Sequence, residues 1–371
     1  MSRVARAASA LVLFAVLVSP ANAGVSNPQI SIIGQPFTSW TDDASDPDRL
    51  RPRLDPGEVE LVYDDYLNPY ARGFLTLTLG EEGLELEEGF FTLFRGLPFD
   101  IALKGGQYRV DFGRINPVHP HAYPFAEPPA VLQAYLPGEE AYIEPGVDLS
   151  RRIPVVGEFS INAQVDWLQG NGFRLERESS GDPSDPLESG AGDHIDETRA
   201  AWLGRLSGFA MLGEQSALDF GISASEGTNN VAAKARTTLL GIDAKAKLWT
   251  SPRAYLVLQA EGIRMDRDEA AWDPASGYTL ASVDPMGGYV YADYNFNTRY
   301  NAGASYERFQ EPVPEKPWTQ AFGAFVGYAL LEETTAFRLD WKRFVPEEGD
   351  AANTLIFRVV FSMGPHKAHQ F

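Results

Sequence analysis

Polar and apolar residues alternate along much of this chain. From Glu158 to Leu168 every second residue is polar, and the residues between them are apolar. Because successive side chains of a β-strand point to opposite faces, this segment predicts a strand with one apolar face and one polar face. The same alternation recurs from near residue 57 to the C-terminus, which indicates an all-β chain.

The order of the connections between these segments suggests how they are arranged. Counting a short candidate at Ile30–Ile33, there are roughly 16 strands, and short turns alternate with longer loops from Arg95 onward. The long loops are expected at 111–140, 169–199 and 265–286. Bacterial outer-membrane barrels combine an even strand number with short periplasmic turns and long extracellular loops. We therefore predict a transmembrane antiparallel up-and-down β-barrel of about 16 strands; a soluble all-β protein is the alternative.

The first 23 residues have the three parts of a secretory signal peptide. A basic start is followed by the apolar run Ala10–Val18 and by an A-x-A site that ends at Ala23. We expect cleavage after Ala23 and a barrel over 24–371; a buried N-terminal helix is the alternative. No later apolar run reaches about 18 residues, so we expect no transmembrane helix. The predicted location is the outer membrane of a Gram-negative bacterium.

Charge and cysteine content exclude two classes of protein. The chain has 31 basic and 51 acidic residues, a net charge of −20, and no cysteine. Nucleic acid is therefore not expected as a partner, because phosphate binding needs a basic surface. A disulfide-stapled secreted domain is excluded as well. Tryptophans near the predicted strand ends, such as Trp167 and Trp202, suggest interfacial aromatic girdles.

If the apolar strand faces contact lipid, the polar faces line a water-filled lumen. Acids outnumber bases on these faces, which predicts a preference for cations. For any single carboxylate, a salt-bridged or solvated group without a transport role is the alternative. The candidate pore-lining residues are Glu58, Glu60, Glu85, Glu87, Lys104, Glu158, Asn162, Gln164, Asp166, Asp243, Lys245, Asp293, Arg338, Asp340 and Arg358.

One segment of the sequence resembles a known family. The run G-Q-Y-R-V-D-F-G at 106–113 resembles the strand-to-loop segment of the phosphate-selective porin O and P family. The continuation through 121, the segment 144–147 and the C-terminal 364–366 look like an uncharacterised branch of outer-membrane proteins. Members of that branch are often named TonB-dependent-receptor-like or zinc-regulated. The resemblance implies an exported barrel of about 16 strands with a pore.

Two features of this sequence differ from those of TonB-dependent receptors and phosphate-selective porins. Only some 30 residues separate Ala23 from the strand at Glu58, too few for the plug domain of a TonB-dependent receptor, so we expect no plug. Phosphate specificity implies a basic constriction, whereas the predicted lumen face is acidic.

The loop 111–140 is long enough to expect a function. It could fold into the lumen as a constriction or cover the mouth outside, and its candidate residues are Arg114, Asn116, His119 and His121. The H-x-H motif could direct two imidazoles to one metal ion, but a zinc site needs three or four ligands. The histidines could equally cap or pack the Pro-rich loop. We therefore assign no metal and no cofactor.

Three functions follow from these patterns. The first is a porin for passive passage of small hydrophilic solutes or ions. The second, an outer-membrane enzyme, is disfavoured because no histidine has a neighbouring nucleophile or acid in a recognisable catalytic arrangement. The third is a surface binding or receptor barrel that works through its long loops, with metal ions as one class of ligand.

Several partners are expected for such a barrel. They are the lipid bilayer, lipopolysaccharide, and the barrel-assembly machinery, which would recognise the last strand and Phe371. A homotrimer is one possible assembly.

Overall fold

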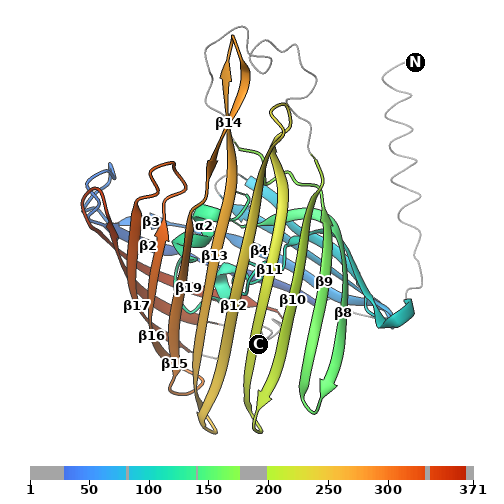
Figure 1. The fold of residues 1–371 in the computed structure, drawn as a ribbon. Helices are drawn as coiled ribbons and strands as arrows, with labels where there is room; N and C mark the ends of the chain where they lie inside the picture. The colour runs from blue at the N-terminus through green and yellow to red at the C-terminus, as the bar shows by residue number, and fades with distance from the viewer. Residues whose placement is uncertain (1–28, 81–82, 139–140, 176–198, 331–334, 365–371) are drawn as a thin grey trace, which may run out of the picture.

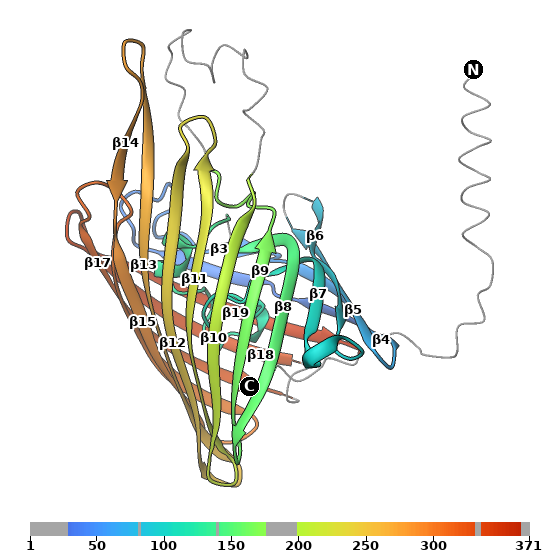
Figure 2. The same cartoon turned by 45° about the vertical axis from the view of Figure 1, so that its right-hand side comes forward.

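The computed structural model describes residues 29–80, 83–138, 141–175, 199–330 and 335–364. The predicted signal peptide and Phe371 lie outside the described residues. Figures 1 and 2 show one antiparallel barrel whose strands tilt around a common axis. Among the described residues, no helix is both long enough and apolar enough to cross a membrane.

Within the described residues, the barrel is built from 19 strand segments and three short helical turns. The helical turns are η1 (Pro98–Asp100), η2 (Pro120–Ala122) and α2 (Ala130–Tyr135). The strands are β1 (Gln29–Gly34), β2 (Phe37–Thr41), β3 (Arg53–Asp55), β4 (Val59–Asn68), β5 (Ala71–Gly80), β6 (Gly83–Leu93), β7 (Ala102–Arg109), β8 (Ile143–Val156), β9 (Phe159–Leu168), β10 (Ala201–Leu212), β11 (Ser216–Asn230), β12 (Ala235–Ser251), β13 (Ala254–Asp273), β14 (Gly277–Val283), β15 (Met286–Asn295), β16 (Tyr300–Gln310), β17 (Trp318–Ala329), β18 (Thr335–Pro346) and β19 (Ala352–Met363).

The 19 segments form 16 barrel strands, because three strands are interrupted. β1 and β2 both pair with β19, and β14 and β15 both pair with β13. β3 and β4 continue each other opposite β2 and β1. Since β1 pairs with β19 on one side and β4 on the other, the sheet closes on itself. The predicted closed antiparallel barrel of about 16 strands is confirmed.

The two ends of the barrel differ in their connections. Turns such as Gly157-Glu158 join strands at one end, here called the turn side. The strand ends at Arg109, Ile143, Leu168 and Ala201, which flank the longer connections, lie at the other end, the loop side. The prediction of a loop without strands at 265–286 is wrong. β13 continues to Asp273 and returns as β14, so the pair rises above the barrel as a hairpin (Figure 1). Both faces of this hairpin lie beyond the rim, so its sequence lacks the alternation of a membrane strand.

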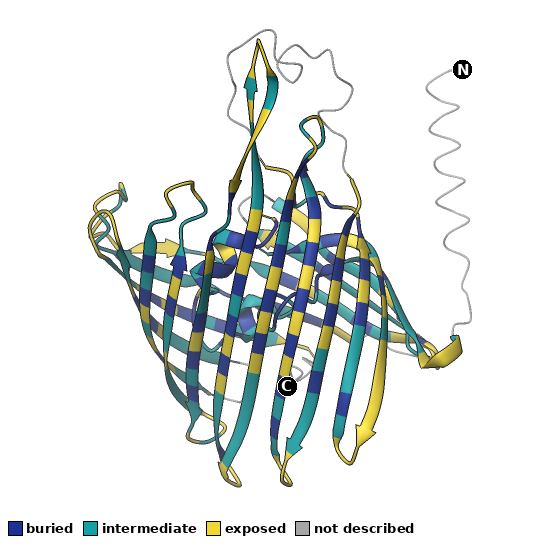
Figure 3. Ribbon diagram, viewed as in Figure 1, coloured by how far each residue is buried: buried dark blue, intermediate teal, exposed yellow. Residues whose placement is uncertain are grey.

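The outer surface of the barrel is apolar and the inner surface largely polar. On β9, Val165 and Trp167 are 54% and 56% exposed, whereas Gln164 and Asp166 are buried. Figure 3 shows the same alternation of exposed and buried residues along neighbouring strands. Trp167 also stacks on its cross-strand neighbour Trp202, with ring centroids 6.2 Å apart. Such an apolar surface with aromatic rings near its rim is typical of barrels that span a membrane.

A second row of aromatic rings lies toward the turn side. Tyr300, Tyr328, Phe337 and Phe357 stack in succession across β16 to β19. Together with the tryptophan pair on the loop side, these rings fit the predicted girdles. Trp249 is an exception: strand alternation puts it on the same face as Asp243, Lys245 and Lys247, toward the lumen.

Candidate functional site

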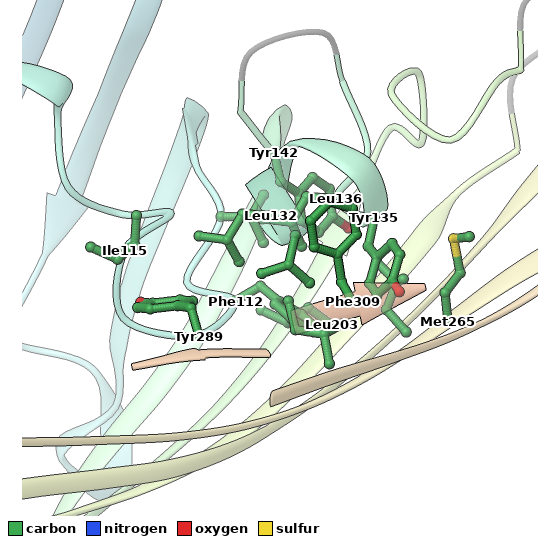
Figure 4. Packing of buried hydrophobic residues seen from close by; sticks show 14 of the residues in the cluster. Phe112, Ile115, Leu132, Tyr135, Leu136, Tyr142, Leu203, Met265, Tyr289 and Phe309 are labelled. Atoms are coloured by element: carbon green, nitrogen blue, oxygen red, sulfur yellow. The ribbon is translucent and has the colours of Figure 1, made fainter. Parts of the chain in front are cut away.

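The connection between β7 and β8 lies inside the barrel. We call residues 110–142 the lumen loop; all of it except 139–140 is described. Its apolar side chains, among them Phe112, Ile115, Leu132 and Tyr135, belong to one buried cluster with residues of the barrel wall (Figure 4). Of the two positions expected for this loop, the structure has the one inside the lumen.

The wall that receives the lumen loop is apolar where the loop packs against it. Leu203, Leu239, Ile263, Phe309 and Phe325, from β10 to β17, point inward and are almost fully buried. Burying a side chain of this size stabilises by about 1.5–3 kcal/mol. Alternation alone predicted a polar inner face, but this part of the inner face is apolar. The loop is held against the β10–β17 side of the barrel.

Acidic side chains of the same wall also hold the loop by its backbone. The Glu261 carboxylate accepts hydrogen bonds from the N–H groups of Arg114 and Ile115, at 3.0 and 2.9 Å. Asp340 accepts one from the N–H of Ala126 at 3.0 Å. Buried backbone N–H groups need such partners, because an unpaired one costs about 1–3 kcal/mol. Asp340 was expected to line the pore and instead anchors the lumen loop.

Asn116 closes the base of the loop. Its amide donates to the carbonyl oxygens of Val110 and Tyr142, at 2.7 and 3.0 Å, and its side-chain oxygen accepts from the N–H of Tyr142 at 2.9 Å. One buried amide thus joins the two ends of the loop. This residue was a candidate for the constriction, and its contacts are those of a residue that fixes the loop's shape.

The lumen loop leaves two cavities, one toward each end of the barrel. The loop-side vestibule has a volume of about 800 Å³ and the turn-side vestibule about 570 Å³. Arg109, at the end of β7, borders both. The narrow region between them therefore lies where the loop faces β1 and β4 to β7, opposite the wall to which the loop is attached.

The two vestibules differ in charge. The loop-side vestibule is bordered by two arginines, Arg109 and Arg358, and by five acids: Asp55, Glu58, Glu85, Glu87 and Glu127. The turn-side vestibule has four acids and five basic residues. Several of the latter are paired, for example Lys104 with Asp111 at 3.0 Å. Of the two vestibules, only the loop-side one has an excess of acids.

Between the vestibules lies a buried group of histidines and charged residues. Nε2 of His119 is 2.8 Å from the Glu88 carboxylate, and Nδ1 of His121 is 3.0 Å from that of Glu60. Arg109 donates through Nε to Glu87 at 2.9 Å and through its backbone N–H to Glu88 at 2.8 Å. We call this group the His–carboxylate cluster: Glu60, Glu87, Glu88, Arg109, His119 and His121.

The surroundings of His119 favour a positive charge on its ring. Burial by itself would lower the pKa of His119. The hydrogen bond to Glu88 and the nearby carboxylates of Glu60 and Glu87 outweigh burial and the repulsion from Arg109, and they raise the pKa above its ordinary value. His119 and His121 thereby tie the lumen loop to the carboxylates on β4 and β6.

The predicted pore-lining residues divide into three sets. Glu58, Glu85, Glu87 and Arg358 border the loop-side vestibule, and Glu60, Lys104, Asn162 and Gln164 border the turn-side vestibule. The third set faces inward but is bound to other protein groups: Asp166 to Tyr108, Asp243 to Arg205, Asp293 to Asn301, Arg338 to the carbonyl of His121, and Asp340 to Ala126.

Three further candidate residues, Lys245, Arg114 and Glu158, belong to none of these sets. Lys245 faces inward by strand alternation. Arg114 reaches Asp219, with a nitrogen–oxygen distance of 3.4 Å. The placement of Glu158 on the lumen wall needs correction: Glu158 lies exposed in the two-residue turn between β8 and β9. The strand begins one residue later than the alternation suggested.

Sequence reasoning missed two members of the cluster, Glu88 and Arg109. Thr76 pairs with Glu88 and Leu77 with Leu86, so Glu87 is an extra residue, a β-bulge that lets two adjacent acids face inward. On β7, Lys104 and Tyr108 face inward as alternation requires, and Arg109, the last residue of the strand, faces inward as well. The adjacent acids at 87–88 are the signal that could have indicated Glu88.

Comparisons with known proteins support the fold. No known family profile matches the chain. An uncharacterised protein of Aquifex aeolicus is 27% identical over 345 residues, which are 84% of this chain and 69% of that protein. The resemblance to the phosphate-selective porins therefore stays a prediction.

Solved outer-membrane proteins share the architecture. A loop-deletion variant of OmpT from Vibrio cholerae has a TM-score of 0.58 at 12% identity, over 91% of this chain and 100% of that one. The channel DcaP of Acinetobacter baumannii has a TM-score of 0.58 at 8% identity, over 92% of this chain and 99% of that one. An anion-selective porin from Comamonas acidovorans has a TM-score of 0.57 at 10% identity, over 91% of this chain and 100% of that one. At such identities the likeness concerns the fold alone.

Proposed function

We propose that this protein is an outer-membrane channel through which small hydrophilic solutes and ions pass by diffusion, without catalysis. The observation that carries the proposal is the lumen loop, which lies across a closed barrel of 16 strands between two vestibules. A barrel of this size encloses more space than its own wall side chains fill. A loop held against one wall then sets the width of the passage along the other.

The proposed location follows from the outer surface. Apolar side chains cover the strands, and aromatic rings lie near both rims, as lipid contact requires. In this proposal residues 1–23 are a cleaved export signal and 24–371 form the barrel. The loop side then faces the cell exterior with its lipopolysaccharide, and the assembly machinery binds the last strand. We include a homotrimer, since OmpT of Vibrio cholerae has been solved in a trimer form.

A preference for cations is part of the proposal. Five acids against two arginines border the loop-side vestibule, and an acidic wall raises the local concentration of cations. This charge distribution disfavours phosphate as the solute. The test is the reversal potential of the purified protein in a planar bilayer under a KCl gradient. A potential of the sign set by K⁺ flow supports the proposal, and one set by Cl⁻ flow contradicts it.

A receptor that works through its loops is the second candidate, and one observation favours it. The β13–β14 hairpin rises above the rim and has at its tip the ring pair Trp272 and Tyr278, with centroids 4.9 Å apart. Both rings are half-buried, and tryptophan and tyrosine are common in binding surfaces. Ion conduction separates the two functions, because a receptor whose lumen is blocked would conduct almost nothing.

A further inference from the structure

Three potential metal ligands meet at the His–carboxylate cluster. Glu60 comes from β4, whereas His119 and His121 flank Pro120 at the helical turn η2 of the lumen loop. One ligand atom from each residue lies within 4.8 Å of the others. Glu60 and His121 are buried, with Glu60 0% exposed, and the His119 side chain is 13% exposed. Two elements distant in sequence therefore present an imidazole–imidazole–carboxylate set at one point.

Two atoms of this set have no hydrogen-bond partner. Oε2 of Glu60 and Nδ1 of His119 are both buried and unpaired, and they lie 3.5 Å apart. A buried carboxylate oxygen without a partner is costly. If Nδ1 has a proton, that proton lies too far from Glu60 for a good hydrogen bond. If Nδ1 has a lone pair, two acceptors face each other, and a cation between them would satisfy both.

The surrounding contacts orient both groups toward that point. Nε2 of His119 is hydrogen-bonded to Glu88, which leaves Nδ1 directed toward carboxylate oxygens of Glu60 and Glu87, each 3.5 Å away. Metal-binding histidines commonly donate their second ring N–H to a carboxylate in this way. Glu88 is itself fixed by the backbone N–H of Arg109, and Gln35 donates to the other oxygen of Glu60 at 3.1 Å. Glu88 and Gln35 thus hold His119 and Glu60 in place, as hydrogen-bond partners of metal ligands do.

We propose that Glu60, His119 and His121 bind a divalent transition cation of the Zn²⁺ type. Two imidazoles and one carboxylate suit Zn²⁺, whereas Mg²⁺ and Ca²⁺ prefer oxygen ligands alone. Bonds of about 2.0–2.2 Å would require the ligand atoms to converge by roughly 1 Å. The three residues border the turn-side vestibule, so the fourth position is open to a water molecule or another small ligand.

The bound cation would act on the lumen loop and on the charge of the passage. It joins the loop to β4, on the side opposite the apolar wall that already holds the loop. It also adds positive charge beside Arg109, which borders both vestibules. If the barrel conducts, as proposed above, binding should lower the passage of cations. Binding itself does not depend on conduction, so the two proposals can fail separately.

The test is calorimetric titration of the folded full-length protein in detergent with ZnCl₂, and with MgCl₂ for comparison. We expect Zn²⁺ binding that is weakened at least about 100-fold by Glu60→Gln and by the double variant His119→Gln/His121→Gln, and about 10–100-fold by Glu88→Gln. Glu85→Gln is the matched control: it removes the same charge from the loop-side vestibule and should bind like the wild type.

Three results would overturn the proposal. Absence of Zn²⁺ binding by the wild type would mean that protons alone occupy the cluster. Equal binding by the wild type and the double histidine variant would locate the metal elsewhere, and equal affinity for Mg²⁺ would contradict the assigned donor set. Folding of each variant is checked by heat-modifiable migration. If the double variant does not fold, Glu60→Gln, which keeps the hydrogen-bonding shape of the side chain, gives the decisive comparison.

Discussion

The carboxylate of Glu261, on β13, accepts a hydrogen bond from the backbone N–H of Ile115 in the lumen loop, with nitrogen and oxygen 2.9 Å apart. A wall residue that strand alternation directs into the lumen thus anchors a segment that enters the lumen from another strand. The same carboxylate accepts from the Arg114 N–H and from the hydroxyl of Tyr289. The position of the loop therefore depends on the wall as much as on its own sequence.

Removing this acceptor should loosen the loop. In Glu261→Ala, two loop N–H groups and the Tyr289 hydroxyl lose their partner, at a cost of about 1.5–3 kcal/mol for each bond to the charged group. We expect single-channel recordings with larger or noisier conductance than the wild type. Glu261→Gln keeps an acceptor oxygen and is the control. Wild-type conductance in the alanine variant would show that Glu261 does not hold the loop.

Replacement of a glycine in the lumen loop should destabilise the barrel. Gly113 has a φ of +69°, and a Cβ there would lie 2.0 Å from a carboxylate oxygen of Glu261. Gly113→Ala should lower the stability of the folded barrel by about 1–2 kcal/mol from backbone strain alone. Gly204→Ala is the control, because nothing lies within 4 Å of its added Cβ. The midpoint of urea unfolding, followed by heat-modifiable migration, measures the difference; equal midpoints would refute the prediction.

The strand alternation predicted the barrel and the two faces of its strands because lipid and water impose a period of two residues on every spanning strand. The connection order predicted the closed topology for a similar reason. The β13–β14 hairpin was not predicted, because it lies beyond the rim, where no lipid contact imposes the alternation. The His119 and His121 motif was visible in the sequence, but its carboxylate partner Glu60 is distant along the chain.

Other parts of the site depend on features that alternation does not encode. The bulge at Glu87 turns Glu88 inward, and Arg109, at the end of β7, faces inward directly after the inward Tyr108. The apolar inner wall near Leu203 and Ile263 becomes understandable only once the loop is known to pack there. Alternation also could not show that some inward acids, such as Glu261 and Asp340, accept hydrogen bonds from the lumen loop.

The acids of the loop-side vestibule should determine ion preference. Replacing Glu58, Glu85 and Glu127 by glutamine removes three of the five acids that border this vestibule. We expect the reversal potential under a KCl gradient to shift toward that of an unselective pore. Glu158→Gln, in the exposed turn between β8 and β9, should leave the potential unchanged. An unaltered potential in the triple variant would show that selectivity arises elsewhere.

Neighbouring residues of β9 should differ in their access to water. Asn162 borders the turn-side vestibule, whereas Ala163 belongs to the outward face with Val165. The natural chain has no cysteine, so single cysteine substitutions can be labelled without background. A water-soluble thiol reagent should modify Asn162→Cys in lipid vesicles and leave Ala163→Cys largely unmodified. Equal labelling of both would contradict the assignment of the two faces.

The central claim is that the lumen is a water-filled passage narrowed by the lumen loop. Single-channel recording of the purified wild-type protein in a planar bilayer tests this claim most directly. The account predicts discrete conductance steps in KCl, with larger steps in Glu261→Ala, in which the loop loses its anchor. A correctly folded barrel that inserts into the bilayer but carries no current, in the wild type and in the variant alike, would contradict it.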